Sequence, residues 1–136
     1  MPHVQSVVST DVPAADRQRV TDWATGRFAD VMETGTGHVA VTVRDDAALR
    51  LGRADEAEPV ALLNADVRAG RTAAQRECYA EAVIEALANH RDVPRGKAYV
   101  VYTEHPGEDF HLAEGPLASS SDEKAETGAE SAHEAD

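Results

Sequence analysis

The sequence predicts an α/β fold of the α+β type, in which two tandem β-α-β units form a four-stranded mixed sheet with both helices on one face. The main observation is that one order of patterns, strand then helix then strand, occurs twice along the chain. The repeat spacing is 57 residues from Pro2 to Pro59 and 59 residues from His38 to Lys97. Each such unit most easily gives two parallel strands joined by a right-handed crossover.

The first unit covers about residues 2–44. It begins with a β-prone run, HVQSVVS, at residues 3–9. Asp11 can cap the following helix, and Pro13 suits its first turn. We expect this helix to end near Gly35, because its apolar residues recur at helical spacing up to that point: Val20, Trp23, Ala24, Phe28 and Val31. The alternating run HVAVTVR, residues 38–44, predicts the second strand.

The second unit covers about residues 59–104 and follows a polar connection at residues 45–58. Residues 59–67 predict a strand, and Thr72 with Gln75 matches a capping box. One apolar face indicates the second helix: Ala80, Val83, Ile84 and Leu87. The run KAYVVYT, residues 97–103, predicts the fourth strand.

The two units make a single domain, residues 1–118. Residues 119–136 carry six acidic residues against one lysine and few apolar side chains, which predicts a disordered acidic tail. The predicted strands are too apolar for the uncovered face of the sheet to meet water. We therefore expect that face to pack against other subunits.

Charge and composition exclude several classes of partner. The net charge of -12 argues against binding to nucleic acid or to an anionic membrane. The excess of acidic residues over lysine indicates adaptation to high salt, the alternative being an ordinary acidic protein. We expect a cytoplasmic protein, since no apolar run is long enough to cross a membrane and no signal peptide is present. The single Cys78 excludes an intramolecular disulfide, and its place in a helix predicts a small buried side chain.

A cluster of arginines marks the start of the second helix. In the stretch ALLNADVRAGRT, residues 61–72, Arg68 and Arg71 flank Gly70 between the end of a strand and a helix start. Two guanidinium groups beside a helix N-terminus form a receptor for a small carboxylate. The alternative is that both arginines are solvated turn residues.

The combination of features resembles the tautomerase superfamily, whose catalytic residue is an amino-terminal proline. The features are Pro2 after the initiator methionine, the duplicated β-α-β pattern, RAGRT at residues 68–72, VYTE at residues 101–104, and Glu114. The nearest branch is similar to cis-3-chloroacrylic acid dehalogenase. The resemblance runs from Pro2 to about Leu117 and implies a homotrimer that binds a small carboxylate substrate. We expect no cofactor and no metal.

The resemblance also implies roles for individual residues. Pro2 resembles the catalytic proline, and Arg68 and Arg71 the pair that binds the substrate carboxylate. Tyr102 stands where that branch has a tyrosine at the site, and Glu114 where it has a water-activating glutamate.

One feature of the branch is missing. The related enzymes use a histidine in the first helix, and this chain has none between Asp11 and Gly37. Thr25 or Arg27 occupies that neighbourhood.

Two mechanisms are open for Pro2, which becomes a secondary amine only when Met1 is removed. A neutral amine near pH 7 can take a proton next to a carbonyl and return it elsewhere, as a keto-enol tautomerase does. A protonated amine, with Glu114 activating water, fits a hydratase or a dehalogenase. We favour the tautomerase because it requires fewer residues.

Two further classes of function compete with these. Five residues could supply oxygen and nitrogen ligands to a divalent metal: Glu104, His105, Glu108, Asp109 and His111. Their spacing fits no standard site. A non-catalytic trimeric binding protein is the other alternative.

Overall fold

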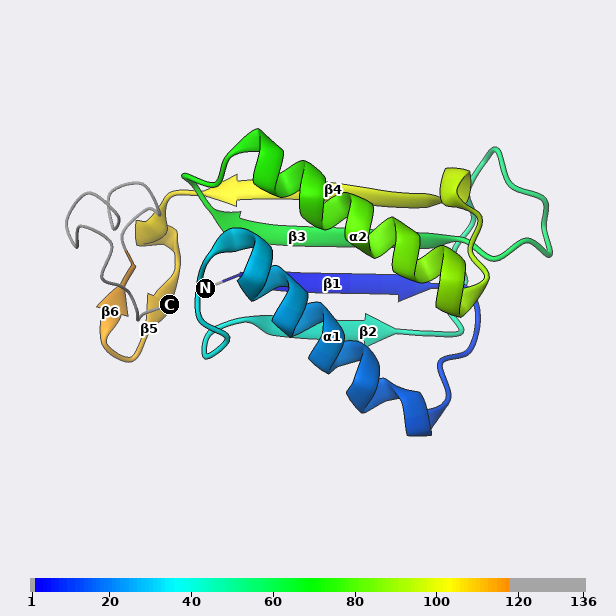
Figure 1. The fold of residues 1–136 in the computed structure, drawn as a ribbon, viewed down its shortest axis with the longest axis horizontal. Helices are drawn as coiled ribbons and strands as arrows, with labels where there is room; N and C mark the ends of the chain where they lie inside the picture. The colour runs from blue at the N-terminus through cyan, green and yellow to red at the C-terminus, as the bar shows by residue number, and fades with distance from the viewer. Residues whose placement is uncertain (1, 118–136) are drawn as a thin grey trace.

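The computed structural model describes residues 2–117, and the predicted acidic tail, residues 119–136, lies outside this range. The sheet has the strand order β2-β1-β3-β4, and both long helices lie on one face of it (Figure 1). This confirms the predicted fold class. The main elements in chain order are β1 (His3–Val8), α1 (Ala14–Met32), β2 (Ala40–Arg44), β3 (Ala61–Arg68), α2 (Ala73–Arg91) and β4 (Ala98–His105). The shorter ones are η1 (Arg95–Lys97), η2 (Gly107–Asp109), β5 (His111–Leu112) and β6 (Gly115–Pro116).

The two β-α-β units have the same strand register. In each unit the parallel pairs join residues 37 positions apart, as Val4 with Val41 and Leu62 with Tyr99. The units meet through an antiparallel pairing of β1 with β3, in which His3 lies opposite Asp66. The sheet is therefore mixed, as predicted.

The helices begin and end with different local chemistry. Thr72 and Gln75 form the predicted capping box at the start of α2. The start of α1 follows Pro13, which makes no side-chain cap, and Asp45 instead binds the nearby Val12 N–H at 2.8 Å. The expected end of α1 near Gly35 is wrong, because the chain leaves the helix after Met32.

The core between helices and sheet depends on one buried aromatic pair. Tyr79 is fully buried, its ring meets that of Phe28 edge-on at 5.2 Å, and its hydroxyl donates to the Ala24 carbonyl at 3.1 Å. The sequence pattern placed Ala80 on the inner face of α2 but not Tyr79. Cys78 lies next to Tyr79 and is exposed, so its predicted burial is wrong. The reason is that Cys78 lies outside the face of α2 that packs against the core.

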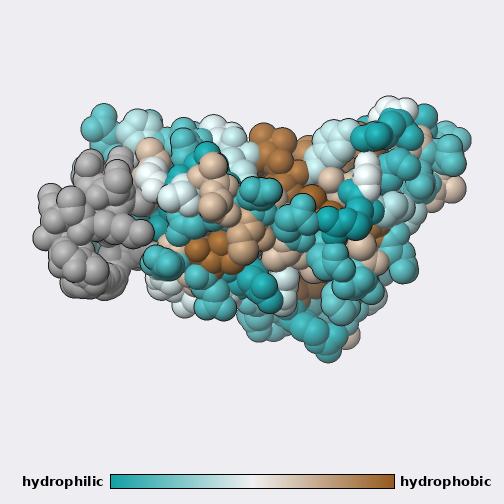
Figure 2. All heavy atoms as spheres, turned by 45° about the horizontal axis from the view of Figure 1, so that its top comes forward, coloured by the Kyte–Doolittle hydropathy of each residue, from teal (hydrophilic) through white to brown (hydrophobic). Residues whose placement is uncertain are grey.

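The two faces of the molecule differ in character. On the helix-bearing side hydrophilic residues dominate, with separate apolar patches between them (Figure 2). On the opposite face of the sheet, Tyr99 and Val101 are 42% and 46% exposed. Polar side chains such as Asn64 and Thr103 share that face, so it is less uniformly apolar than the strand runs implied. Neither long helix is apolar enough to cross a membrane.

Tyr79→Phe tests the link between the helices. The change removes the hydrogen bond to Ala24 and keeps the ring packing, so the free energy of unfolding should fall by about 1 kcal/mol. Urea unfolding measures it. Gln18→Ala removes an exposed hydrogen bond to Asp22 on the surface of α1; it is the control and should change stability by less than about 0.5 kcal/mol. Equal effects of the two variants would contradict a stabilising role for the buried hydroxyl.

Candidate active site

Pro2 lies buried at the start of β1, the second strand of the sheet. Its carbonyl accepts a hydrogen bond from the Ala40 N–H at 3.0 Å, which ties the chain start to β2. On the other side, the antiparallel register continues from the His3–Asp66 pair toward Val67. The start of the chain is therefore held between two neighbouring strands.

Several segments meet at this end of the sheet. Figure 1 shows that the start of β1, the ends of β3 and β4, the end of α1 and the start of α2 lie at one end of the sheet, with the short β5–β6 hairpin beyond it. Arg68 is the last residue of β3 and is only 3% exposed. Because β1 and β3 are antiparallel, the end of β3 that carries Arg68 lies at the end where Pro2 begins β1. The structure therefore brings these two predicted residues to the same end of the sheet.

Arg71 connects the two helices. Gly70 adopts a φ of 115°, which favours glycine and turns the chain sharply before the helix. The Arg71 Nη1 then donates to the Met32 carbonyl at 2.6 Å, and Gln75 Nε2 donates to the Val31 carbonyl at 3.2 Å. The last carbonyls of α1 thus accept hydrogen bonds from Gln75 in α2 and from Arg71 just before it, and Glu33 ends α1 in a left-handed conformation with a φ of 56°.

Tyr102 lies on the helix side of β4. Its hydroxyl donates to the Arg76 carbonyl in the first turns of α2 at 2.8 Å. Burial raises the pKa of Tyr102 to about 12, against the opposing charge of Arg76, so its hydroxyl stays protonated at neutral pH. Tyr99 faces the other side of the sheet, as the spacing of three residues predicts.

Glu114 is exposed in the turn between β5 and β6. The hairpin is attached to the end of the sheet by Phe110, whose ring meets that of His105 edge-on at 5.4 Å. The Phe110 carbonyl also accepts from the Leu117 N–H at 3.0 Å. Glu114 therefore stands on a separate small element at the same end as Pro2 (Figure 1).

A side-chain hydrogen bond that the sequence analysis did not identify lies nearby. His105 Nε2 is 2.9 Å from Asp66 Oδ1, on the face of the sheet away from the helices. Thr103 pairs with Asp66 in the sheet, so His105 lies two residues further on the same face. This pair depends on the register between β3 and β4, so no pattern within either strand could have predicted it.

The candidate metal ligands do not converge. Among residues 2–117, no three histidine, cysteine, aspartate or glutamate side chains are placed to hold one ion. Glu104 binds Arg76 at 2.8 Å, whereas His105 binds Asp66 on the other face. The geometry thus gives no support to a site built from these residues.

Comparison with known proteins identifies the family. The sequence profile of macrophage migration inhibitory factor (MIF) matches residues 1–111. This chain belongs to the MIF family. Since that family is part of the tautomerase superfamily, the resemblance of the sequence is confirmed. The match ends before Glu114. A search of curated protein sequences found no match.

Solved structures of low sequence identity share the fold. MIF from Oncomelania hupensis is 15% identical, with a TM-score of 0.74, covering 93% of this chain and 88% of that one. N1, a member of the cis-3-chloroacrylic acid dehalogenase family, is 24% identical, with a TM-score of 0.70, covering 91% and 90%. Pt0534, whose structure was solved after inactivation by 2-oxo-3-pentynoate, is 18% identical, with a TM-score of 0.69, covering 85% and 96%.

Arg71 has a structural task in this MIF-family chain, and Arg71→Met tests it. The change keeps the apolar stem and removes the donors to Met32, so the free energy of unfolding should fall by about 1.5 kcal/mol, as for a charged hydrogen bond. Arg95→Met is the matched control, because Arg95 forms exposed ion pairs with Glu81 and Glu85, and such surface pairs contribute little to stability. Urea unfolding compares the two. A loss no larger than that of the control would show that Arg71 does not hold the end of α1.

Proposed function

We propose that this protein is a cytoplasmic proton-transfer enzyme, a keto-enol tautomerase acting on a small 2-oxo or unsaturated carboxylic acid. The observation that carries the proposal is that Pro2 is buried at one end of the sheet, and that β3 ends there in the buried Arg68. Family membership supports the same chemistry. So does the inactivation of Pt0534 by an unsaturated 2-oxo acid, although that protein shares only the fold.

Pro2 is the proposed base once Met1 is removed. An α-amino group titrates near neutral pH, at about 7.7–8.0 in model peptides. Burial and a cationic neighbour both favour the neutral form of such an amine. A neutral secondary amine can take the proton from the carbon next to the substrate carbonyl and return it at another atom.

Arg68 and Arg71 are the proposed partners of the substrate carboxylate and of the enolate that develops from it. A planar guanidinium matches a carboxylate in a bidentate way, and a buried one does so with little competition from water. Arg71 also donates to the Met32 carbonyl at the end of α1. In this proposal it therefore positions the end of that helix as well as binding the substrate. We assign Tyr102 a positioning role, because its hydroxyl donates to the start of α2.

A hydratase or dehalogenase is the second candidate. The β5–β6 hairpin carries the exposed Glu114 at the same end as Pro2, which favours a water-activating base there. In that mechanism Pro2 is protonated and acts as the acid. A non-catalytic binding protein is the remaining alternative and predicts no turnover at all.

We also propose that the protein works as a homotrimer. Tyr99 and Val101 leave apolar surface exposed on the sheet face that no helix covers, and burial of such a patch favours association. The helices lie on the other face, so this surface is open to a second chain.

The role of Pro2 is tested by mass and by covalent labelling. We expect intact mass to show that the mature protein begins at Pro2, and 2-oxo-3-pentynoate to attach one equivalent to the N-terminal peptide while turnover of 2-oxo acid enols stops. Pro2→Ala should lower kcat by about 10²–10⁴-fold, the usual contribution of an acid-base group. Pro94→Ala, at an exposed proline, is the control. Full turnover by a chain that retains Met1 would rule the proposal out.

Glu114→Gln separates the two proline mechanisms, because it removes the charge at nearly constant shape. For the tautomerase, activity should persist or rise near neutral pH, since the carboxylate opposes a neutral amine. For the hydratase, addition of water to an unsaturated acid should be lost. Initial rates with an enol and with an unsaturated acid measure both. If enol turnover collapses while thermal unfolding is unchanged, Glu114 itself handles a proton and the tautomerase mechanism is wrong.

Sedimentation equilibrium tests the assembly. The wild-type chain should sediment as three copies in high salt. Val101→Asp places a charge on the uncovered sheet face and should shift the mass toward one copy, because burying an unpaired charge is costly. Ala74→Asp, on the exposed surface of α2, should leave the mass unchanged. A wild-type monomer would contradict the proposal.

A further inference from the structure

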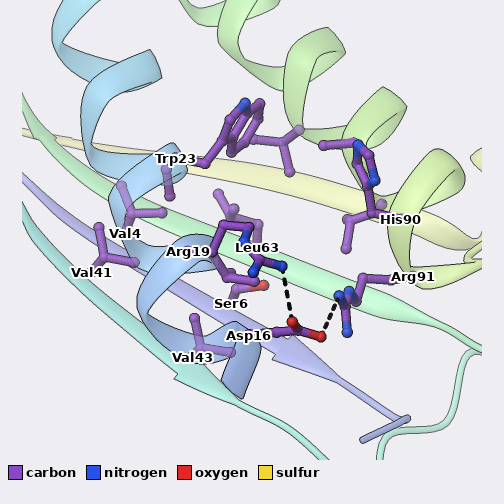
Figure 3. Close-up of a pocket in the computed structure, with 15 residues that line it drawn as sticks. Val4, Ser6, Asp16, Arg19, Trp23, Val41, Val43, Leu63, His90 and Arg91 are labelled. Carbon is purple, nitrogen blue, oxygen red and sulfur yellow. Dashed lines mark hydrogen bonds and ion pairs between the residues drawn. The ribbon is translucent and has the colours of Figure 1, made fainter. Parts of the chain in front are cut away.

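A cavity of about 230 Å³ lies between α1, α2 and the sheet (Figure 3). None of the residues proposed for the proline site lines it. The lining residues come from both helices and three strands, with the sheet forming the floor through Val4, Ser6, Val41, Val43 and Leu63. The cavity is therefore a separate feature, on the helix-bearing side of the molecule.

The interior of the cavity is apolar. Its walls carry Trp23 and Val20 from α1 and Val83 and Leu87 from α2, above the valine-rich floor. A dry cavity of about 150 Å³ is large enough to bind benzene, and drug-sized ligands occupy about 300–1,000 Å³. The space thus suits a small molecule somewhat larger than one aromatic ring.

The edge of the cavity is basic, within a protein of net charge -12. Asp16 lies between Arg19, at 3.0 Å, and Arg91, at 3.2 Å, and His90 stands beside them on α2 (Figure 3). One carboxylate is shared by two guanidinium groups, so the edge keeps an excess of positive charge. The Arg19 side chain is 78% exposed and can turn toward a ligand with little loss.

A purely structural explanation accounts for only part of this edge. His90 and Arg91 lie in the last turn of α2, where cations stabilise the helix dipole. Arg19 lies in the first half of α1, where the dipole gives it no such benefit. Arg19 pairs with Asp16, and Asp16 also binds Arg91. This pairing therefore places a second guanidinium group at the edge of the apolar cavity.

We propose that this cavity binds an amphipathic monocarboxylate, such as a medium-chain fatty acid anion. The apolar body lies over the floor of the cavity between the helices, and the carboxylate meets Arg19 and Arg91 at the edge. The site is independent of the proline chemistry and holds whether or not the protein is a tautomerase.

Trp23 gives a direct readout, because it is the only tryptophan in the chain and lines the cavity. Octanoate should change its fluorescence in a saturable way. 1-Octanol has the same chain without the charge and should bind about tenfold more weakly, since a charged hydrogen bond is lost. Octylamine should bind more weakly still. High salt should weaken octanoate and leave 1-octanol unaffected. No saturable signal with octanoate, or equal affinities for the three compounds, would overturn the proposal.

Variants locate the site on the protein. Arg91→Gln should weaken octanoate about tenfold and spare 1-octanol. Arg95→Gln removes the same charge from a residue outside the lining and should have no effect. Ala86→Phe fills the cavity from α2 and should abolish binding of both compounds. Octanoate binding that survives Ala86→Phe in a folded protein would place the ligand elsewhere and refute the site.

Discussion

The pairing of β1 with β3 is the constraint on which the rest of the structure depends. It is the one antiparallel contact in a sheet whose other pairs are parallel, and it joins the two β-α-β units into one layer. Because the strands run in opposite directions, the beginning of β1 meets the end of β3. For this reason the buried Pro2 and the buried Arg68, from distant parts of the chain, lie at the same end of the sheet.

Side-chain contacts join α1 to α2 and the turn before it at three places, and the cavity lies between two of these contacts. Donors from Arg71 and Gln75 bind the end of α1, Tyr79 binds its middle, and Arg91 binds its first turn through Asp16. Between Tyr79 and Arg91 the side chains that α2 presents to the cavity include Val83, Ala86 and Leu87. The apolar cavity occupies that stretch, so it follows from how the helices are attached.

The sequence was sufficient for the fold because the duplication repeats every element in the same order. Pro2 and Arg68 were assigned to one site only through the resemblance to the tautomerase superfamily, because no pattern in the sequence predicted the antiparallel pairing of β1 with β3. The inner face of α2 was harder to predict, because the apolar pattern that includes Ala80 and Val83 defines that face only to within about one residue. The pattern therefore did not identify the buried Tyr79, and it wrongly predicted that Cys78 is buried. The pairing of His105 with Asp66 depends on the register between strands, which no local pattern reveals.

The equal registers of the two units make the sheet symmetric, with each residue of the first unit matched by one 59 positions later, as Val4 and Leu63, which both lie in the core. The counterpart of Pro2 is Ala61, which begins β3 in the middle of the chain. A peptide nitrogen within a chain is an amide and has no basic lone pair, whatever its surroundings. Joining two units in one polypeptide thus leaves one terminal amine for every two units. A proline at the corresponding position of the second unit, at the opposite end of the sheet, could not act as a base and need not be retained.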